Sequence, residues 1–479
     1  MANKANSFPT KNFFINMLTR DISLNDAILD LLDNCLDGAL RSQKSGSQNG
    51  SEKNYDGFEA KITISQDSFK IEDNCGGISR DLAENYAFRM GKQNYEDNQE
   101  ATIGIYGIGM KRAIFKIGKS AVVETKKGTD AFAVKIPTDW AENDDNWTFE
   151  IEDCDTRKEL PDGTSICVTN LTSGVAIQWE DQDSIDYFVE TLISEIKDSY
   201  SLIIEKGFTI YVNNHKVKCN PIQLLLSKES EFKPYIFKKT YEGDVDVKLI
   251  VGFYAPPPSD DDLDEGTESK RSSSVAGWTI VCNDRVVLYN DKSYNTGWGE
   301  AGVPQYHTQF IGIRGMVIFE SKNPAKLPMT TTKRGIDLSS PIYADVKNKM
   351  REGLKLFTNY TNQWKGQNKQ ERTYSEKAES FPYTTLIQND ESFNHTYGLN
   401  YRKKDGGFIS QPNLPKPKNE KKHVIIRYSK PIDDVQIVKT FFSPDESIEM
   451  KASDVGEKCF EFILKRQREN NIENKNEHN

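Results

Sequence analysis

Hydrophobic side chains near the N-terminus recur at the spacing of a helix. Between residues 23 and 40 the apolar positions fall on one stripe, formed by Leu24, Ala27, Ile28, Leu31, Leu32 and Cys35. This pattern predicts an amphipathic helix with a buried stripe. A second face of the same helix gathers polar side chains, namely Asp26, Asp30, Asp33, Asn34 and Asp37. Such a face is either a solvated surface or the wall of a binding site.

The residues that follow alternate between strand and helix patterns. Residues 60–65 and 68–73 have the alternation of a β-hairpin, and residues 79–90 have that of a helix. Further strand patterns come later, at residues 120–125, 131–136, 147–153 and 164–171. This mixture of helices and antiparallel strands predicts an α+β sandwich.

Breaks in the pattern divide the chain into parts. We predict a first α/β domain at 1–175, a connecting helix at 176–205, a second α/β domain rich in strands at 206–366, a linker at 367–425 and a small helical module with a polar tail at 426–479. Residues 256–274 interrupt the second domain and have the composition of a disordered insertion.

Composition narrows the class of protein. The chain has 479 residues, and no apolar run is long enough to cross a membrane. The N-terminus lacks the apolar core of a signal peptide. Seven cysteines are scattered without a Cys-x-x-Cys pair, which argues against a zinc site and favours the reducing cytoplasm. The net charge of −10 does not indicate a nucleic-acid binder, although basic stretches lie near the C-terminus.

The predicted hairpin ends in the stretch "IEDNCGGIS", residues 71–79. An aspartate at a strand end, Asp73, can accept a hydrogen bond from an exocyclic amine. The paired glycines Gly76 and Gly77 let a flat ring approach the backbone. The alternative is an ordinary Asx-type turn.

A third stretch, "GIYGIGMKRA", places glycines at the start of a helix. Gly104, Gly107 and Gly109 precede Lys111, which lies in the first helical turn. Amides at a helix N-terminus bind phosphate well, and glycine lets the oxygens come close. The spacing matches neither a P-loop nor the dinucleotide-binding fingerprint.

The order and spacing of these three stretches resemble the GHKL ATPase superfamily, which includes gyrase B, MutL, the ninety-kilodalton heat-shock chaperones, MORC proteins and histidine kinases. "DLLDNCLDGA" is similar to its first motif, "DNCGGI" to its second and "GIYGIGMK" to its third, and "DGTSICVTNL" resembles its final glycine-threonine strand. The resemblance covers roughly residues 1–175 and implies a Bergerat-type sandwich that binds ATP.

The resemblance implies a role for each matching residue. Asn34 matches the asparagine that holds Mg²⁺, Asp73 matches the aspartate that reads the adenine amine, and Thr164 supports Asp73 through water. The phosphate-contacting and lid positions correspond to Gly77, Gly104, Gly107, Gly109 and Lys111. Magnesium suits such a site because it binds through one or two protein oxygens together with substrate phosphates.

Two positions depart from the family pattern. The family's general base is usually a glutamate four residues before the asparagine, and here that position is Asp30. Its side chain is one methylene shorter, and a misplacement of about 1 Å can lower a rate ~100-fold. Cys75 replaces the first glycine of the second motif. These departures leave ATP binding as the expectation but predict slow hydrolysis.

The second domain resembles the S5-like transducer domain of MutL, gyrase B and MORC proteins. "VCNDRVV" is similar to an asparagine-x-arginine strand of that domain. "LPMTTTKRGID" resembles the loop that reaches the γ-phosphate, with Lys333 as the lysine and Lys326 and Arg334 as competing choices. The acidic helix begins near residue 23, which leaves no room before it for the helical hairpin of a histidine kinase.

Two functions from different classes remain. In the first, the protein is a Mg²⁺-dependent ATPase that forms an ATP-gated dimeric clamp through residues 8–23, while its C-terminal module recruits DNA or a protein partner. In the second, it is a nucleotide-gated scaffold that binds ATP with negligible hydrolysis, and Asp30 is the residue that discriminates between them. A role in DNA processing or phage defence rests on analogy with MORC-like proteins alone.

Overall fold

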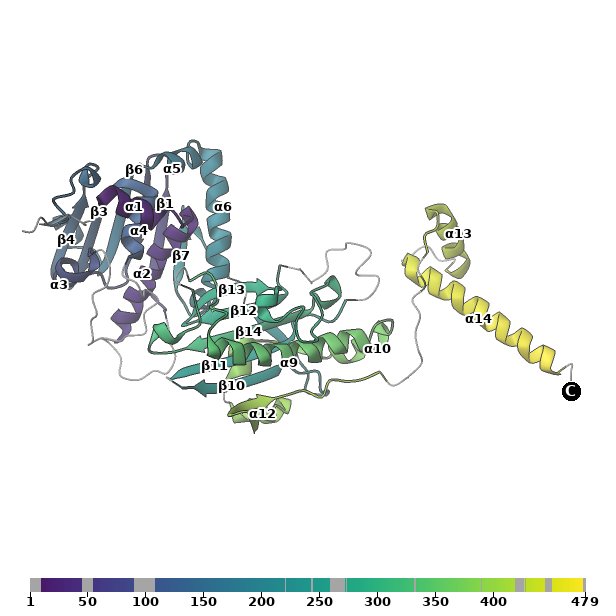
Figure 1. Cartoon of the computed structure of the whole chain (residues 1–479). Coiled ribbons are helices and arrows are strands. Elements are labelled where there is room, and N and C mark those ends of the chain that lie inside the picture. The colour runs from purple at the N-terminus through teal and green to yellow at the C-terminus, as the bar shows by residue number, and fades with distance from the viewer. Residues whose placement is uncertain are drawn as a thin grey trace, which may run out of the picture.

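The computed structural model describes most of the chain. The described residues are 10–44, 55–89, 108–219, 221–242, 244–258, 272, 274–330, 333–388, 390–417, 426, 428–443 and 450–476. Two sheet-based units lie next to each other, and two C-terminal helices stand apart from them (Figure 1).

An eight-stranded sheet forms the first unit, in the order β5-β4-β3-β6-β2-β1-β7-β8. Its strands are β1 (Glu59–Ile64), β2 (Ser68–Asp73), β3 (Gly118–Lys127), β4 (Asp130–Ile136), β5 (Glu150–Asp153), β6 (Gly163–Leu171), β7 (Thr209–Val212) and β8 (His215–Lys216). Neighbouring strands are antiparallel except for the parallel pair β1 and β7. In β1, Ala60, Ile62 and Ile64 are buried while Lys61 and Thr63 are exposed, so one face of the sheet carries the core.

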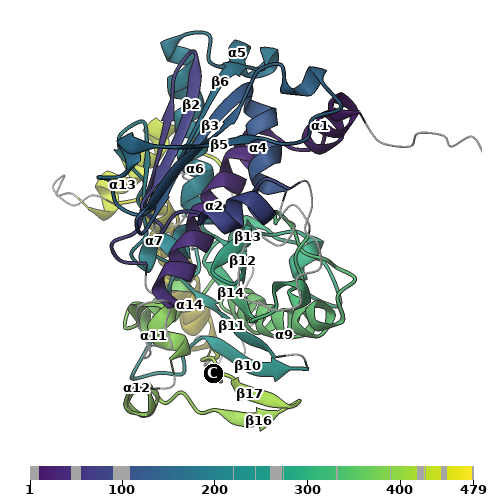
Figure 2. The ribbon, with the colours of Figure 1, turned by 90° about the vertical axis from the view of Figure 1, so that its left-hand side faces the viewer.

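Helices cover the apolar face of this sheet. They are α1 (Lys11–Thr19), α2 (Leu24–Lys44), α4 (Gly109–Ile117) and α6 (Gln182–Ser199). The unit also contains the short helices α3 (Arg80–Leu82), α5 (Ser173–Gln178) and α7 (Ser201–Glu205). The predicted apolar stripe of α2 is buried, which confirms that prediction. Helices α2 and α4 lie side by side on the sheet (Figure 2). This pairing brings the acidic helix against the segment that follows the glycine stretch.

A seven-stranded sheet forms the second unit, in the order β13-β12-β14-β11-β10-β17-β16. Its strands are β10 (Tyr235–Tyr241), β11 (Val245–Phe253), β12 (Gly277–Cys282), β13 (Arg285–Asp291), β14 (Ile313–Glu320), β16 (Arg402–Lys404) and β17 (Gly407–Ser410). The long helix α9 (Pro341–Gln363) packs on one face through Val346, Met350 and Leu354. A two-stranded sheet of β9 (Gln223–Leu226) and β15 (Glu379–Pro382) contributes to a smaller core.

The boundary predicted at residue 206 differs from the structure. Strands β7 and β8 lie beyond it but belong to the first sheet, because β7 pairs with β1. Ile210 and Val212 are buried there in the core of the first unit. The predicted connecting helix also packs on this core, through residues such as Phe188 and Leu192 of α6. A short strand pattern does not specify which sheet it joins, and this explains the misplaced boundary.

The predicted linker at 367–425 also differs from the structure. It contains α10 (Asn368–Ser375), β15, α11 (Tyr383–Ile387), α12 (Glu391–Tyr397), β16 and β17. Strand β17 pairs with β10, and Ile409 is buried in the second core. These elements are too short to produce a clear period in the sequence. Most of the predicted insertion at 256–274 lies outside the described residues.

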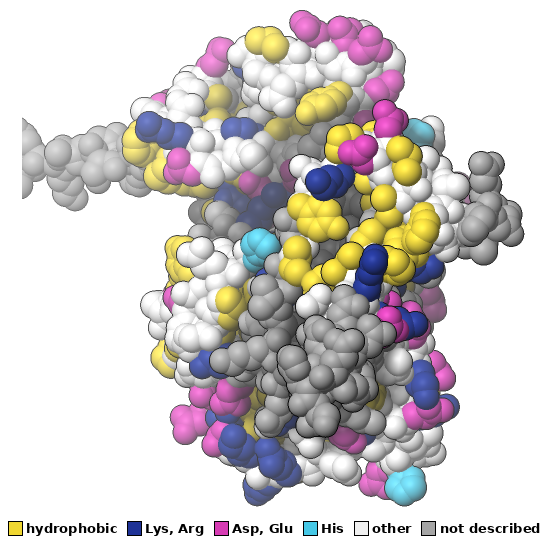
Figure 3. Space-filling view, turned by 90° about the vertical axis from the view of Figure 1, so that its right-hand side faces the viewer, with side chains coloured by type: hydrophobic (Ala, Val, Ile, Leu, Met, Phe, Trp, Pro, Cys, Tyr) yellow, Lys and Arg dark blue, Asp and Glu magenta, His cyan; other side chains and the backbone are white. Residues whose placement is uncertain are grey.

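The C-terminal module consists of α13 (Ile432–Phe442) and α14 (Ala452–Asn476). Several of its large apolar side chains are exposed, namely Ile432, Ile437, Phe441, Phe460, Phe462, Ile463 and Leu464. Viewed from the side on which these helices lie, the molecule presents a cluster of hydrophobic side chains (Figure 3). None of the helices in the described part of the chain has the length and apolar character needed to cross a membrane.

Candidate active site

The acidic face of α2 is largely buried. Asp30, Asp33 and Asp37 are 7%, 1% and 4% exposed, and Asn34 is half-buried. A buried carboxylate is costly unless it is paired or hydrogen-bonded. These three aspartates are therefore not part of a solvated surface, and neighbouring elements must supply the cations or hydrogen-bond donors that stabilise them.

Asp30 is paired with a cation from the neighbouring helix. The Arg112 guanidinium, in the first turn of α4, donates a hydrogen bond to Asp30 Oδ2. Gly109 begins the same helix, and a Cβ added there would lie 3.5 Å from the Asp30 side chain. The start of α4 is therefore packed directly against this carboxylate.

Asp33 receives partners from both units. Tyr200, at the end of α6, donates a hydrogen bond of 2.7 Å to Asp33 Oδ1. From the second unit, Arg285 Nε lies 3.3 Å from Oδ1 and Lys333 Nζ lies 2.7 Å from Oδ2. Burial raises the pKa of Asp33, but the Lys333 and Arg285 charges outweigh this effect and hold that pKa below its usual value.

Lys333 reaches the acidic helix from a loop that follows β14. Its ammonium lies 3.7 Å from Asp30 Oδ1 as well as 2.7 Å from Asp33 Oδ2. Lys326 and Arg334 were the other candidates for the lysine position of this loop. Lys326 is exposed to solvent, and Arg334 pairs with Asp26 and Glu195. Lys333 is thus the one of the three side chains that contacts Asp30.

Asp73 lies at the end of β2 in a mostly buried position. Its Oδ1 accepts backbone hydrogen bonds from Cys75 (2.8 Å) and Thr164 (3.3 Å). Burial is the main cause that raises the pKa of Asp73. A further donor to the carboxylate would stabilise its charged form. The Cys35 thiol, which is also within reach of the Leu31 carbonyl, is one such donor, and its hydrogen bond partly offsets the effect of burial on the pKa of Asp73.

The backbone that follows Asp73 forms a tight turn packed against strand β3. Gly77 has a φ of +65°, and a Cβ there would lie 1.9 Å from the Lys126 carbonyl oxygen, so only glycine fits. The Thr125 hydroxyl accepts from the Ile78 amide (2.8 Å) and shares a hydrogen bond with the Thr164 hydroxyl (3.2 Å). This network connects Thr164 with the glycine turn.

The glycine stretch is only partly described. Gly104 and Gly107 lie outside the described residues, whereas Gly109 starts α4 beside Asp30. Lys111 is buried, and its ammonium donates to the Ala87 carbonyl at 2.9 Å. Burial lowers the pKa of Lys111 to about 8. The structure therefore places Arg112 rather than Lys111 at the Asp30 carboxylate.

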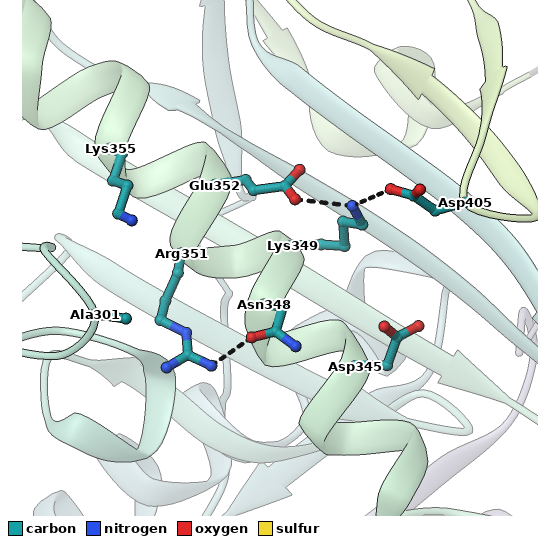
Figure 4. Close-up of a pocket in the computed structure, with 8 residues that line it drawn as sticks. All are labelled: Ala301, Asp345, Asn348, Lys349, Arg351, Glu352, Lys355 and Asp405. Carbon is teal, nitrogen blue, oxygen red and sulfur yellow. Dashed lines mark hydrogen bonds and ion pairs between the residues drawn. The ribbon is translucent and has the colours of Figure 1, made fainter.

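A separate cavity of about 420 Å³ lies along α9 in the second unit (Figure 4). It is lined by Ala301, Asp345, Asn348, Lys349, Arg351, Glu352, Lys355 and Asp405. Lys349 pairs with Glu352 (2.9 Å) and Asp405 (2.6 Å), and Arg351 bonds to Asn348 (2.6 Å). None of the lining residues comes from the stretches that resemble nucleotide-binding motifs, so we assign this cavity no part in nucleotide binding.

The described residues contain no cluster of three or more His, Cys, Asp or Glu side chains arranged around a metal ion. A magnesium ion that comes with a nucleotide does not need such a cluster, since phosphates and water supply most of its ligands. Asn34 offers an amide oxygen on the same helix as Asp30, so the donor chemistry fits such an ion.

Four members of this site were not identified from the sequence. Arg112 follows the lysine of the third motif directly, and Asp33 was seen only as part of an acidic face. Tyr200 carries no local signal, because its contact with Asp33 spans 167 residues. Arg285 lies in the noticed "VCNDRVV" stretch, but its proximity to Asp33 could not be derived from that stretch.

Comparison with known families agrees with this geometry. Residues 22–162 match the family model described as histidine kinase-, DNA gyrase B-, and HSP90-like ATPase. The matched segment begins just before α2 and ends just before β6, so it contains Asp30, Asn34 and Asp73. It supports a GHKL-type ATPase domain and suggests that this domain binds ATP. A search of curated proteins finds no match to the chain.

Proposed function

We propose that the protein is a Mg²⁺-dependent ATPase of the GHKL type that works as an ATP-gated clamp. The observation that carries this proposal is the position of Lys333. A lysine from the second unit lies against two carboxylates of the helix that carries the first GHKL-like motif. A clamp requires such a link, because the state of the nucleotide must be transmitted from one domain to the next.

The base of the nucleotide would bind at the end of β2. Asp73 uses one oxygen for two backbone donors, and its other oxygen can accept the exocyclic amine of adenine. Gly77 lets the chain turn tightly after Asp73, with its backbone packed against the Lys126 carbonyl. Thr164 supports the carboxylate through its backbone amide. The phosphates would extend toward the start of α4, where the backbone amides and the dipole of a helix N-terminus favour anions.

Asp30 is the proposed general base for ATP hydrolysis. Its carboxylate would accept a proton from the attacking water, a role that contributes ~100–10,000-fold to a rate. Lys333 would place its compact positive charge on the γ-phosphate and stabilise the charge that develops during transfer. Asn34 would hold Mg²⁺, which neutralises and orients the phosphates when it is bound.

A second candidate function is a nucleotide-gated scaffold with negligible turnover. Two observations favour it: aspartate replaces the usual glutamate, and this aspartate is engaged by Arg112. A base held in an ion pair is less free to take a proton. The scaffold and the clamp make opposite predictions for the rate of phosphate release, while both predict ATP binding.

The remaining parts of the proposal concern architecture and partners. We assign the second unit to the S5-like class of MutL and MORC-like proteins, and we expect an ATP-dependent homodimer formed through α1. Phe13 and Met17 of α1 are 61% and 54% exposed, which leaves them available for a partner copy.

The exposed apolar side chains of α13 and α14 favour recruitment of a protein over DNA. The cytoplasmic location and the role in DNA processing or phage defence stay predictions.

One experiment tests the proposed function. ATP and ADP binding are measured by calorimetry with and without Mg²⁺, and phosphate release is followed with and without DNA. We expect binding that depends on Asp73 and slow turnover that depends on Asp30. Binding without any phosphate release would favour the scaffold, and no binding at all would refute both functions.

A further inference from the structure

Asp33 occupies the junction between the acidic helix and the second unit. Its side chain is 1% exposed and has three partners, Tyr200, Arg285 and Lys333. The Arg285 guanidinium also stacks on the Tyr200 ring, with 4.1 Å to the centroid, and donates to the Ser199 carbonyl at 3.1 Å. This carboxylate is therefore fixed by the end of α6 as well as by the second sheet.

We infer that Asp33 is a positioning residue that holds Lys333 beside the reaction centre. Asp30 and Asp33 are one helical turn apart on α2, and the Lys333 ammonium lies 3.7 Å from the first and 2.7 Å from the second. Without Asp33 a flexible lysine would have no anchor on that side. The inference rests on the proposed ATPase function and adds a residue to it.

Backbone geometry supports the need for such an anchor. Lys333 has a φ of +57°, in the left-handed region that residues other than glycine adopt at a cost. The Lys333 amide closes this turn by donating to the Thr330 carbonyl at 2.9 Å, but the long side chain beyond it is fixed only by its own contacts. Opposite charges also outweigh burial at Lys333, whose pKa lies above its usual value, so it is charged at neutral pH.

Other contacts keep the two units together when Asp33 is changed. Asp284, in the turn between β12 and β13, accepts from Lys206 at 2.7 Å and from Tyr55 at 3.1 Å. Arg334 pairs with Glu195 of α6 at 3.0 Å. Removing the Asp33 charge should therefore displace the Lys333 ammonium without separating the units.

The test compares kcat and KM for ATP in four full-length proteins: the parent, Asp33→Asn, Lys333→Met and the double variant. We expect Asp33→Asn to lower kcat at least ~10-fold with little change in KM, because a shift of about 1 Å in a catalytic group can cost ~100-fold. We expect the double variant to be no slower than Lys333→Met, since residues that act as one unit are not additive.

A different result for the double variant would overturn the inference. If Asp33 has only a structural role, its effect will multiply with that of Lys333→Met and the double variant will be slower than either single variant. Should Asp33→Asn fail to fold, Asp33→Glu, which keeps the negative charge but moves it by one methylene, replaces it in both the single and the double variant. Asp26→Asn is the matched control, because it removes a carboxylate from the same helix that contacts Arg334 instead of Lys333. A parent protein that binds no ATP would contradict the proposed function, whereas an active parent with multiplying effects would contradict the role of Asp33 alone.

Discussion

Replacing Asp30 by glutamate tests whether this site is built around the shorter side chain. The GHKL-like pattern alone suggests that glutamate would restore the family base and raise turnover. The structure leads to the opposite expectation. The start of α4 packs against Asp30, because a Cβ added at Gly109 would already be in van der Waals contact, at 3.5 Å, with the Asp30 Cβ and Cγ. Arg112 already pairs with the carboxylate at its present position.

The size of the effect follows from this packing. An extra methylene in a well-packed site costs ~1–3 kcal/mol, and displacing a reacting group by about 1 Å can cost ~100-fold in rate. We therefore expect Asp30→Glu to lower kcat ~10–100-fold while affinity for a non-hydrolysable ATP analogue changes little. The analogue does not need the base, so its affinity separates loss of chemistry from loss of the pocket.

The assay is single-turnover phosphate release at saturating ATP, with calorimetry for the analogue. Asp30→Ala is the control for loss of the base and should abolish turnover while it retains binding. Adding Arg112→Lys to Asp30→Glu shortens the cation and should recover part of the lost rate. A glutamate variant that equals or exceeds the parent would refute the argument from Gly109 and Arg112.

Three further predictions address the rest of the proposed machinery. Asp73→Asn should weaken ATP binding ~30–150-fold in calorimetry with an unchanged melting temperature, because a buried hydrogen bond to a charged group contributes about 2–3 kcal/mol; unchanged affinity would place the base elsewhere. Lys333→Ala should lower turnover ~100-fold or more and leave ADP affinity nearly constant, since ADP lacks the γ-phosphate. The control Lys326→Ala should have a smaller effect on turnover, and a larger effect would show that the wrong lysine of the loop was assigned to the γ-phosphate. Phe13→Asp should reduce the dimer formed with an ATP analogue in light scattering, whereas Ile177→Asp, at a similarly exposed apolar position outside α1, should not; equal dimer fractions would contradict the role of α1.

The candidate site could be proposed from the sequence because its parts are short and contiguous. The acidic face of α2 follows from helical spacing, and Asp73 is adjacent to its glycine turn. Residues within one element have fixed relative positions once the element forms, so a local pattern is sufficient to identify them. The match of residues 22–162 to the GHKL-type family agrees with that reading.

The organisation of the second half was less accessible from the sequence. The pattern of the sequence predicted that β7 belongs to the second unit, but β7 pairs with β1 of the first. It also predicted a linker at residues 367–425, where β17 pairs with β10 of the second sheet. Strand pairing depends on contacts between distant segments, and short elements leave almost no period to detect. Neither feature is encoded within a single window of the sequence.

The sequence by itself determined which residues could carry the chemistry: the carboxylates of α2, the strand-end Asp73 and a lysine in the loop after β14. Only the tertiary structure decided how they combine. Arg112 pairs with Asp30 across 82 residues, and Lys333 reaches Asp33 across 300. A buried carboxylate requires a cation or a donor, but several lysines and arginines of the chain could satisfy that requirement. The packing of α4 and of the second sheet against α2 makes the choice, because it fixes which charged side chains come within reach.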